Sequence, residues 1–294
     1  MEIKNVQLDD LKAEEKYWLS FPLRPELYNE LREKFAGLPL IIINRENEII
    51  FGIDYYHFLR STDVLYADVL QIDISPKDAL ILNYNLKESL TGLNLYEKLV
   101  FIKRVMPLAE PSEIYRKTGL DINVNKELVE KLDLLLSTTF RRSFVEETIG
   151  LKTELKLCDF LPDDRETLLD LFAKIPFTTS HQLKILEMAE EIIFRDKCSM
   201  NETFEKLNIE QYIDTDMEKP QRQIIDALFK YRNPIYTESE AKWEEEIKNL
   251  HLPDNMKVTH FPFFEKRNLE LTIQLQDFEE LKRFIDKIKV HKPA

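Results

Sequence analysis

Residues 38–59 constrain the fold more than any other part of the chain. They contain two short apolar runs rich in β-branched side chains, residues 40–43 and 49–51, with five polar residues between them. Such runs around a polar turn predict a β-hairpin. Gly52 follows the second run, and apolar residues then recur at helical spacing. The segment therefore predicts strand, turn, strand, glycine and helix in that order.

The rest of the chain reads mainly as helix. Residues 69–74 alternate between apolar and polar and predict a third strand, after which Pro76 opens a helix. Residues 9–37 are expected to form a helical lead-in, and helical spacing dominates from residue 94 onward. The C-terminus predicts a β–β–α unit, because residues 269–275 alternate and residues 278–288 repeat at helical spacing. The predicted fold class is α+β and mainly helical.

Three domains are expected from these patterns. They are an N-terminal α/β domain over residues 1–93, a helical domain over 94–217, and a C-terminal α+β domain over 218–294. The last boundary is placed at the polar segment 214–220, which ends in proline.

The order of parts resembles ParB-type chromosome-partition proteins, within the ParB/sulfiredoxin-like superfamily. That resemblance implies a small N-terminal α/β domain, a helical middle with a helix-turn-helix, and a C-terminal ββα dimerisation unit. It also implies that nucleotide phosphates bind at the glycine-to-helix junction, where free N–H groups favour anions. Sulfiredoxin chemistry is excluded, because Ile53 and Asp54 stand where those enzymes have their nucleophilic cysteine.

The residues that would bind a nucleotide are mostly replaced. The junction carries no arginine before Arg60, and the family's Glu-Asn-x-x-Arg motif becomes Tyr84-Asn-Leu-Lys-Glu88, with a carboxylate in place of the arginine. A carboxylate facing a triphosphate repels it unless a metal intervenes. The sequence therefore predicts no catalytic residue, no metal site, no cofactor, and a vestigial nucleotide site at Gly52, Asp54, Tyr55, Asn85 and Glu88. The enzymatic alternative is a nucleotide-dependent phosphotransferase of the ParB-like kinase type, with Asp54 and Glu88 near the phosphates.

The net charge of −13 argues against strong DNA binding, which depends on Lys and Arg. Residues 1–93 and 151–217 are acidic, whereas 94–150 and 218–294 are neutral. A possible helix-turn-helix lies at residues 114–136, with Gly119 in the turn. An ordinary helical hairpin explains the same pattern. If DNA binds, the expected contacts are Arg116, Lys117, Lys126 and Lys131.

The function expected from the sequence is that of a non-catalytic ParB-like protein in DNA-associated partition or regulation. It would act through protein contacts, including a homodimer, and possibly through weak DNA binding; a pure protein-assembly module is a further alternative. No run is long and apolar enough to span a membrane, and the N-terminus lacks a signal-peptide core. A cytoplasmic location without membrane contact is therefore expected. The two cysteines, 40 residues apart, predict no disulfide framework or zinc site.

Overall fold

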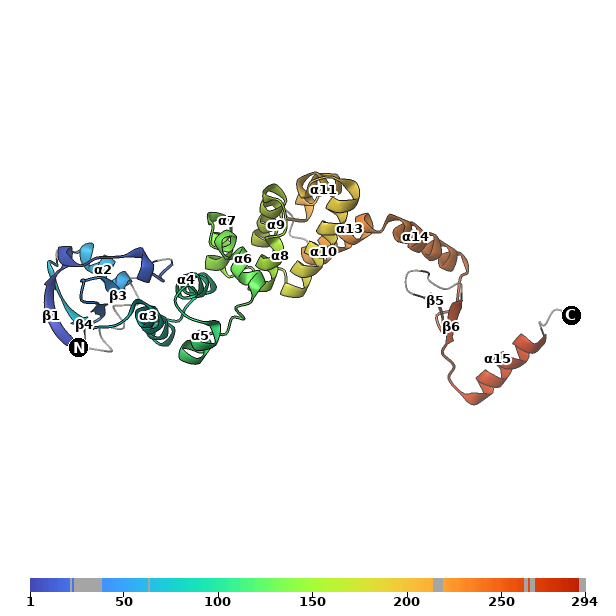
Figure 1. Ribbon diagram of the computed structural model, residues 1–294. Helices are drawn as coiled ribbons and strands as arrows, with labels where there is room; N and C mark the ends of the chain where they lie inside the picture. The colour runs from blue at the N-terminus through green and yellow to red at the C-terminus, as the bar shows by residue number, and fades with distance from the viewer. Residues whose placement is uncertain are drawn as a thin grey trace. The chain divides into compact units, whose positions relative to one another are not determined.

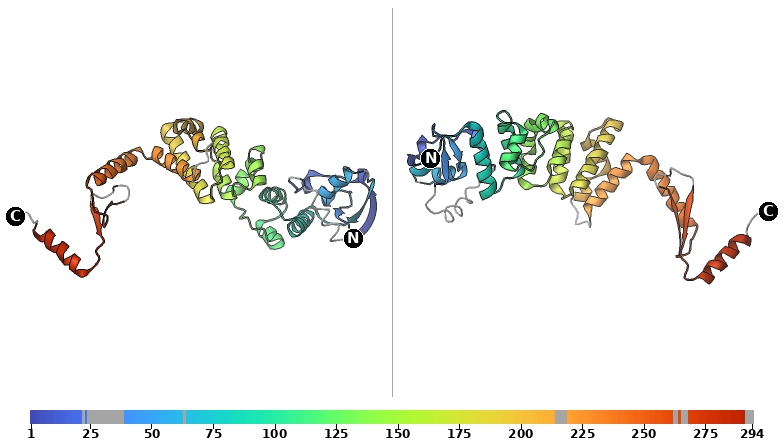
Figure 2. Two further views of the ribbon diagram at one scale, coloured as in Figure 1. Left: turned by 180° about the vertical axis from the view of Figure 1, so that it is seen from behind. Right: turned by 60° about the horizontal axis from the view of Figure 1, so that its bottom comes forward.

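The computed structural model describes residues 1–21, 23, 39–62, 64–213, 219–261, 264 and 268–290. Helices dominate these residues, with a four-stranded sheet near the N-terminus and a two-stranded sheet near the C-terminus (Figures 1 and 2). The predicted class, α+β and mainly helical, agrees with this arrangement. None of the described helices is both long and apolar enough to cross a membrane.

The strands are β1 (Glu2–Gln7), β2 (Ile41–Ile43), β3 (Ile49–Phe51), β4 (Tyr66–Gln71), β5 (Met256–His260) and β6 (Leu269–Ile273). Short 3₁₀ helices cover Leu8–Asp10 and Glu15–Tyr17. The helices up to the middle of the chain are α2 (Ile53–Arg60), α3 (Pro76–Leu90), α4 (Leu95–Val105), α5 (Pro111–Thr118), α6 (Lys126–Leu135), α7 (Thr138–Glu146) and α8 (Leu151–Leu157). The later helices are α9 (Pro162–Lys174), α10 (Thr179–Asp196), α11 (Met200–Leu207), α12 (Glu210–Ile213), α13 (Pro220–Arg232), α14 (Pro234–Asn249) and α15 (Phe278–Val290).

The N-terminal sheet has the strand order β1-β4-β2-β3. The hairpin strands β2 and β3 pair antiparallel, and β2 pairs parallel with β4 after the crossover through α2. The first strand, β1, pairs antiparallel with β4 and lies at the outer edge of the sheet (Figure 1). The predicted order of strand, turn, strand, Gly52 and helix is confirmed, and a third strand follows, although β4 spans Tyr66–Gln71 and not the predicted residues 69–74.

Helices cover both faces of this sheet. On one face, the α2 residues Ile53, Tyr56 and Leu59 pack with the inward side chains of β2, β3 and β4. On the other face, Leu86 and Leu90 of α3 pack against Leu40 and Phe51. This two-sided burial explains why the β2 and β3 sequences are continuously apolar rather than alternating.

The start of the chain differs from the predicted helical lead-in. Residues 2–7 form β1, which was not predicted, and residues 9–21 form turns and 3₁₀ helices instead of a regular helix. The remainder of the predicted lead-in, residues 24–37, lies outside the described residues. β1 escapes prediction because its side chains are mostly polar and exposed, so it has almost no apolar alternation.

The chain divides into two compact units. One comprises Met1–Leu186 with Ser199–Glu202, and the other Glu187–Cys198 with Thr203–Ala294. This division falls within α10, and the three domains expected from the sequence, with a last boundary at residue 217, stay a prediction. The first unit contains the N-terminal sheet and most of the buried apolar side chains, and the second contains β5, β6 and α13 to α15. In the second unit, the predicted β–β–α order near the C-terminus is confirmed.

Candidate functional site

The Gly52 junction is shaped by a steric requirement of the fold. Gly52 is the N-cap of α2 and has a φ of 89°, a conformation that L-residues with a side chain rarely adopt. A Cβ at this position would collide with the carbonyl oxygen of Leu40 in the neighbouring segment. The glycine is therefore needed to bring the start of α2 close to the start of β2, whether or not a ligand binds.

Behind this junction lies a buried cluster of charges, which we call the Lys87 network: Ser20, Asp54, Lys87 and Glu97. The Lys87 Nζ donates to Ser20 Oγ at 2.5 Å and lies 3.5 Å from both Asp54 Oδ2 and Glu97 Oε1. Ser20 Oγ in turn donates to Asp54 Oδ2. The side chains of the three charged residues are at most 4% exposed. Lys87 thus connects α2, α3 and α4 through buried ionic contacts.

Glu97 also fixes the local backbone. It accepts hydrogen bonds from the N–H groups of Phe21 at 2.9 Å and Asn94 at 3.0 Å. The Asn94 side chain accepts from the Glu97 N–H in return, which completes a capping box at the start of α4. Lys87 therefore contacts a carboxylate that also fixes the backbone at Phe21 and at the start of α4.

The predicted nucleotide residues contact different parts of the structure and do not form one cluster. Asp54 belongs to the Lys87 network, and Tyr55 stacks on Phe58 beside the β-sheet core. Asn85 Nδ2 donates to the carbonyl of Lys117 at 3.1 Å, on the side of α3 that faces α5. Glu88 accepts from the Leu93 N–H at 2.9 Å and lies 3.3 Å from Lys98 Nζ.

Sequence reasoning missed Lys87, although it is the cation that contacts Asp54. A lysine in a helix normally lies at the surface, so a pattern of residue types gives no sign that this one is buried. The one available signal is its position between Leu86 and the predicted Glu88. Among the described residues, no group of three or more His, Cys, Asp or Glu is placed to hold a metal ion.

The proposed DNA-binding cations lie on or between α5 and α6, as predicted, and Gly119 ends α5 with a φ of 65°. Three of the four form ion pairs. Lys117 Nζ lies 3.0 Å from both Asp78 and Glu113, and these hydrogen bonds raise the pKa of Lys117. Lys131 lies 2.7 Å from Asp159, and Lys126 lies 3.6 Å from Glu130. The fourth cation, Arg116, is exposed.

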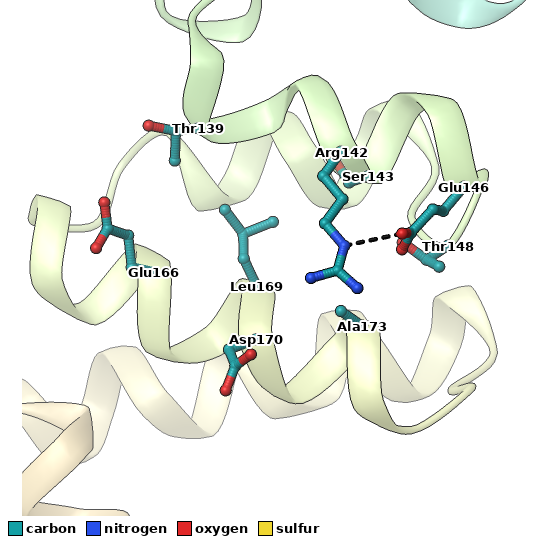
Figure 3. Close-up of a pocket in the computed structure, with 9 residues that line it drawn as sticks. All are labelled: Thr139, Arg142, Ser143, Glu146, Thr148, Glu166, Leu169, Asp170 and Ala173. Carbon is teal, nitrogen blue, oxygen red and sulfur yellow. Dashed lines mark hydrogen bonds and ion pairs between the residues drawn. The ribbon is translucent and has the colours of Figure 1, made fainter.

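A cavity of about 250 Å³ lies between α7 and α9 (Figure 3). Figure 3 shows the Arg142 guanidinium reaching toward Asp170 and Ala173, and its Nε donates to Glu146 Oε1 at 2.8 Å. The lining contains hydroxyls, apolar side chains and three carboxylates: Thr139, Arg142, Ser143, Glu146, Thr148, Glu166, Leu169, Asp170 and Ala173.

Beside this cavity, Ser143 contacts a fully buried acid. Its Oγ lies 2.7 Å from the Phe140 carbonyl and 2.8 Å from Glu154 Oε1. The Ser143 hydroxyl is the donor in both contacts, so its single proton is shared between the Phe140 carbonyl and the Glu154 carboxyl group. Burial raises the pKa of Glu154 to about 8, with the Ser143 hydrogen bond acting in the opposite direction. Burial therefore favours the protonated, neutral form of Glu154.

No protein-family model matches this chain, and no curated protein matches it. Among solved structures, it is similar to one described as the structure of the C2221 form of a Pnob8-like ParB-N domain. The two share 15% sequence identity, and the match covers 77% of this chain and 97% of that chain with a TM-score of 0.37. A match this loose carries no inference about function.

Proposed function

We propose that the chain is a non-catalytic ParB-like protein that acts in DNA-associated partition or regulation through protein contacts. The observation that carries the proposal is the Lys87 network. The N-terminal domain has the strand–glycine–helix order expected of a ParB-like scaffold. At the junction where that family binds phosphates, the first turn of α2 contributes a buried carboxylate, Asp54, to an internal ion pair.

The chemistry of this network supports a structural role. The Lys87 Nζ lies 3.5 Å from two carboxylates and donates to Ser20 Oγ, so its hydrogen bonds and ion pairs are all made inside the fold. Asp54 is 2% exposed and cannot reach a substrate without opening of the network. Glu88, its proposed partner in the enzymatic alternative, is engaged by Lys98 and the Leu93 N–H.

Weak DNA binding is the second part of the proposal. An ion-paired lysine must give up its carboxylate partner before it neutralises a phosphate, which lowers the gain from counterion release. Three of the four α5–α6 cations have such partners. Affinity should therefore be modest. Because the attraction that remains is electrostatic, we also expect affinity to fall steeply with salt.

The protein contacts in the proposal centre on the C-terminal unit. Leu269 is 59% exposed, Leu271 is 52% exposed and Phe278 is 69% exposed. Two strands and one helix gain little stability alone, so these apolar side chains need a covering surface. A second copy is the proposed cover, since two-fold dimers are the commonest homo-oligomers.

Titration calorimetry with CTP and with ATP, each with magnesium, tests the non-catalytic assignment. We expect no saturable binding at micromolar nucleotide concentrations. A micromolar Kd for either nucleotide would overturn the assignment and favour the phosphotransferase.

A low-salt DNA-binding assay tests the second part. Reversing the charges of Arg116 and Lys117 to Glu should abolish measurable binding, whereas the same reversal at the exposed Lys174 and Lys184 should preserve it. Equal binding by both double variants would show that DNA contacts another surface.

A further inference from the structure

The edge strand β1 has unpaired backbone groups on one side. Its register with β4 pairs Glu2 with Gln71 and Gln7 with Tyr66. The next pair in this register is Leu8 with Leu65, and the Leu8 N–H donates a hydrogen bond to the Leu65 carbonyl at 2.9 Å. Because hydrogen-bonded pairs alternate in an antiparallel ladder, the even-numbered residues of β1 bond to β4.

The odd-numbered residues Ile3, Asn5 and Gln7 therefore direct their N–H and C=O groups toward the open edge. Among the described residues, no other strand pairs with that edge. Exposed apolar side chains accompany it: Ile3 is 60% exposed, and the β4 residue Tyr66 is 55% exposed. An exposed edge of this kind is a template for another strand.

The charges of β1 determine which strand fits. When two copies of β1 pair antiparallel through their odd-numbered residues, an axis in the central part of the strand passes through Ile3, Lys4 or Asn5. An axis at Ile3 puts Glu2 of each copy opposite Lys4 of the other, and Ile3 opposite Ile3. An axis at Lys4 puts the two lysines opposite each other, which is destabilising. An axis at Asn5 leaves both charges opposite apolar residues.

We propose that β1 is a self-association surface, and that two copies of this chain join their N-terminal sheets by antiparallel pairing of β1 around a two-fold axis at Ile3. The backbone groups of Ile3 and Asn5 then find partners, and two reciprocal Glu2–Lys4 pairs flank an apolar Ile3 contact. Within one chain, Lys4 Nζ already lies 3.3 Å from Glu2, and both side chains are at least 40% exposed. They can therefore exchange partners without burying a charge.

This contact is independent of the proposed C-terminal dimer and would add to it. Each two-fold contact alone closes a dimer. A chain with two different two-fold contacts forms a closed oligomer only when the two axes intersect suitably. In either case the assembly contains more than two chains.

The test uses the whole 294-residue chain carrying Leu271→Lys, which puts a charge into the C-terminal surface and removes that contact. Light scattering at high micromolar concentration should report a dimer for this variant. Adding Glu2→Lys or Lys4→Glu should give a monomer, because each change places like charges opposite one another. Combining Glu2→Lys with Lys4→Glu should restore the dimer, because the pairs form again with their signs exchanged.

A proline provides a second, backbone-based arm. Ile3→Pro removes one N–H from the open edge and none from the β1–β4 ladder, a position where strands tolerate proline. In the same Leu271→Lys chain it should give a monomer with an unchanged circular-dichroism spectrum, whereas Ile3→Thr keeps the N–H and should weaken the dimer less. A Leu271→Lys chain that is monomeric with native β1, or a dimer that persists in Ile3→Pro, would overturn the proposal. If the Leu271→Lys chain with native β1 is a monomer, an extended peptide from another protein becomes the alternative partner of the β1 edge.

Discussion

At the scale of single residues, Glu154 makes the stability of the fold depend on pH near neutrality. It is completely buried, and its Oε2 has no hydrogen-bond partner. The folded state holds a proton on it up to a pH of about 8, whereas an unfolded chain releases that proton near the ordinary glutamate pKa. The folded state therefore binds more protons than the unfolded state between these two values. Stability falls as pH rises across this window, by about 1.4 kcal/mol per pH unit at most.

We predict that Glu154→Gln removes this dependence. Glutamine keeps the shape and the contact with Ser143 but has no proton to lose. Thermal unfolding between pH 6 and pH 8 should show a falling midpoint for the native chain and a flatter profile for the variant. Glu166→Gln, an exposed carboxylate on α9, serves as the matched control and should follow the native chain. Identical slopes for the native chain and Glu154→Gln would show that Glu154 is ionised in the folded state.

The residue scale also marks the limit of sequence-based prediction. Gly52 could be predicted, because a glycine between an apolar run and a helical pattern signals a special backbone conformation. Lys87 and Glu154 could not, because both are charged residues that usually lie in water. Their burial depends on tertiary neighbours from distant segments, such as Ser20 for Lys87, and no local pattern records those neighbours.

At the scale of elements, the apolar patterns were reliable and the functional surfaces were not. Periodicity predicted β2, β3, β4 and α3, because each buries a face in the sheet core. It could not show that Lys117 of α5 would pair with Asp78 of α3, a contact between residues 39 positions apart. Charge pairing of this kind decides whether a cation is available to DNA, so the predicted DNA surface stays a prediction.

The Lys87 network gives an element-scale prediction about how α2, α3 and α4 hold together. Lys87→Met removes the ammonium that Asp54 and Glu97 share, and should cost about 3–5 kcal/mol of stability, as breaking a buried ion pair does. Lys103→Met on α4, where the lysine is 52% exposed and pairs with Asp133, should cost less than about 1 kcal/mol. Chemical denaturation of the two variants measures the difference. Similar losses for both would show that the network contributes little to the fold.

At the scale of the whole molecule, the proposed C-terminal contact makes the chain a dimer even when the β1 edge is blocked. Leu269 and Leu271 of β6 are exposed in the part of the chain that the structure describes. A charged side chain at either position would prevent this face of β6 from packing on a second copy. In a chain carrying Ile3→Pro, light scattering should therefore report twice the 35.0 kDa chain mass. Adding Leu271→Lys should halve that mass. Adding Leu250→Lys, which changes a leucine of similar exposure outside the ββα unit, should leave the dimer intact. A monomeric Ile3→Pro chain at high micromolar concentration would contradict the proposed C-terminal dimer. The apolar face of β6 would then be covered by something other than a second copy.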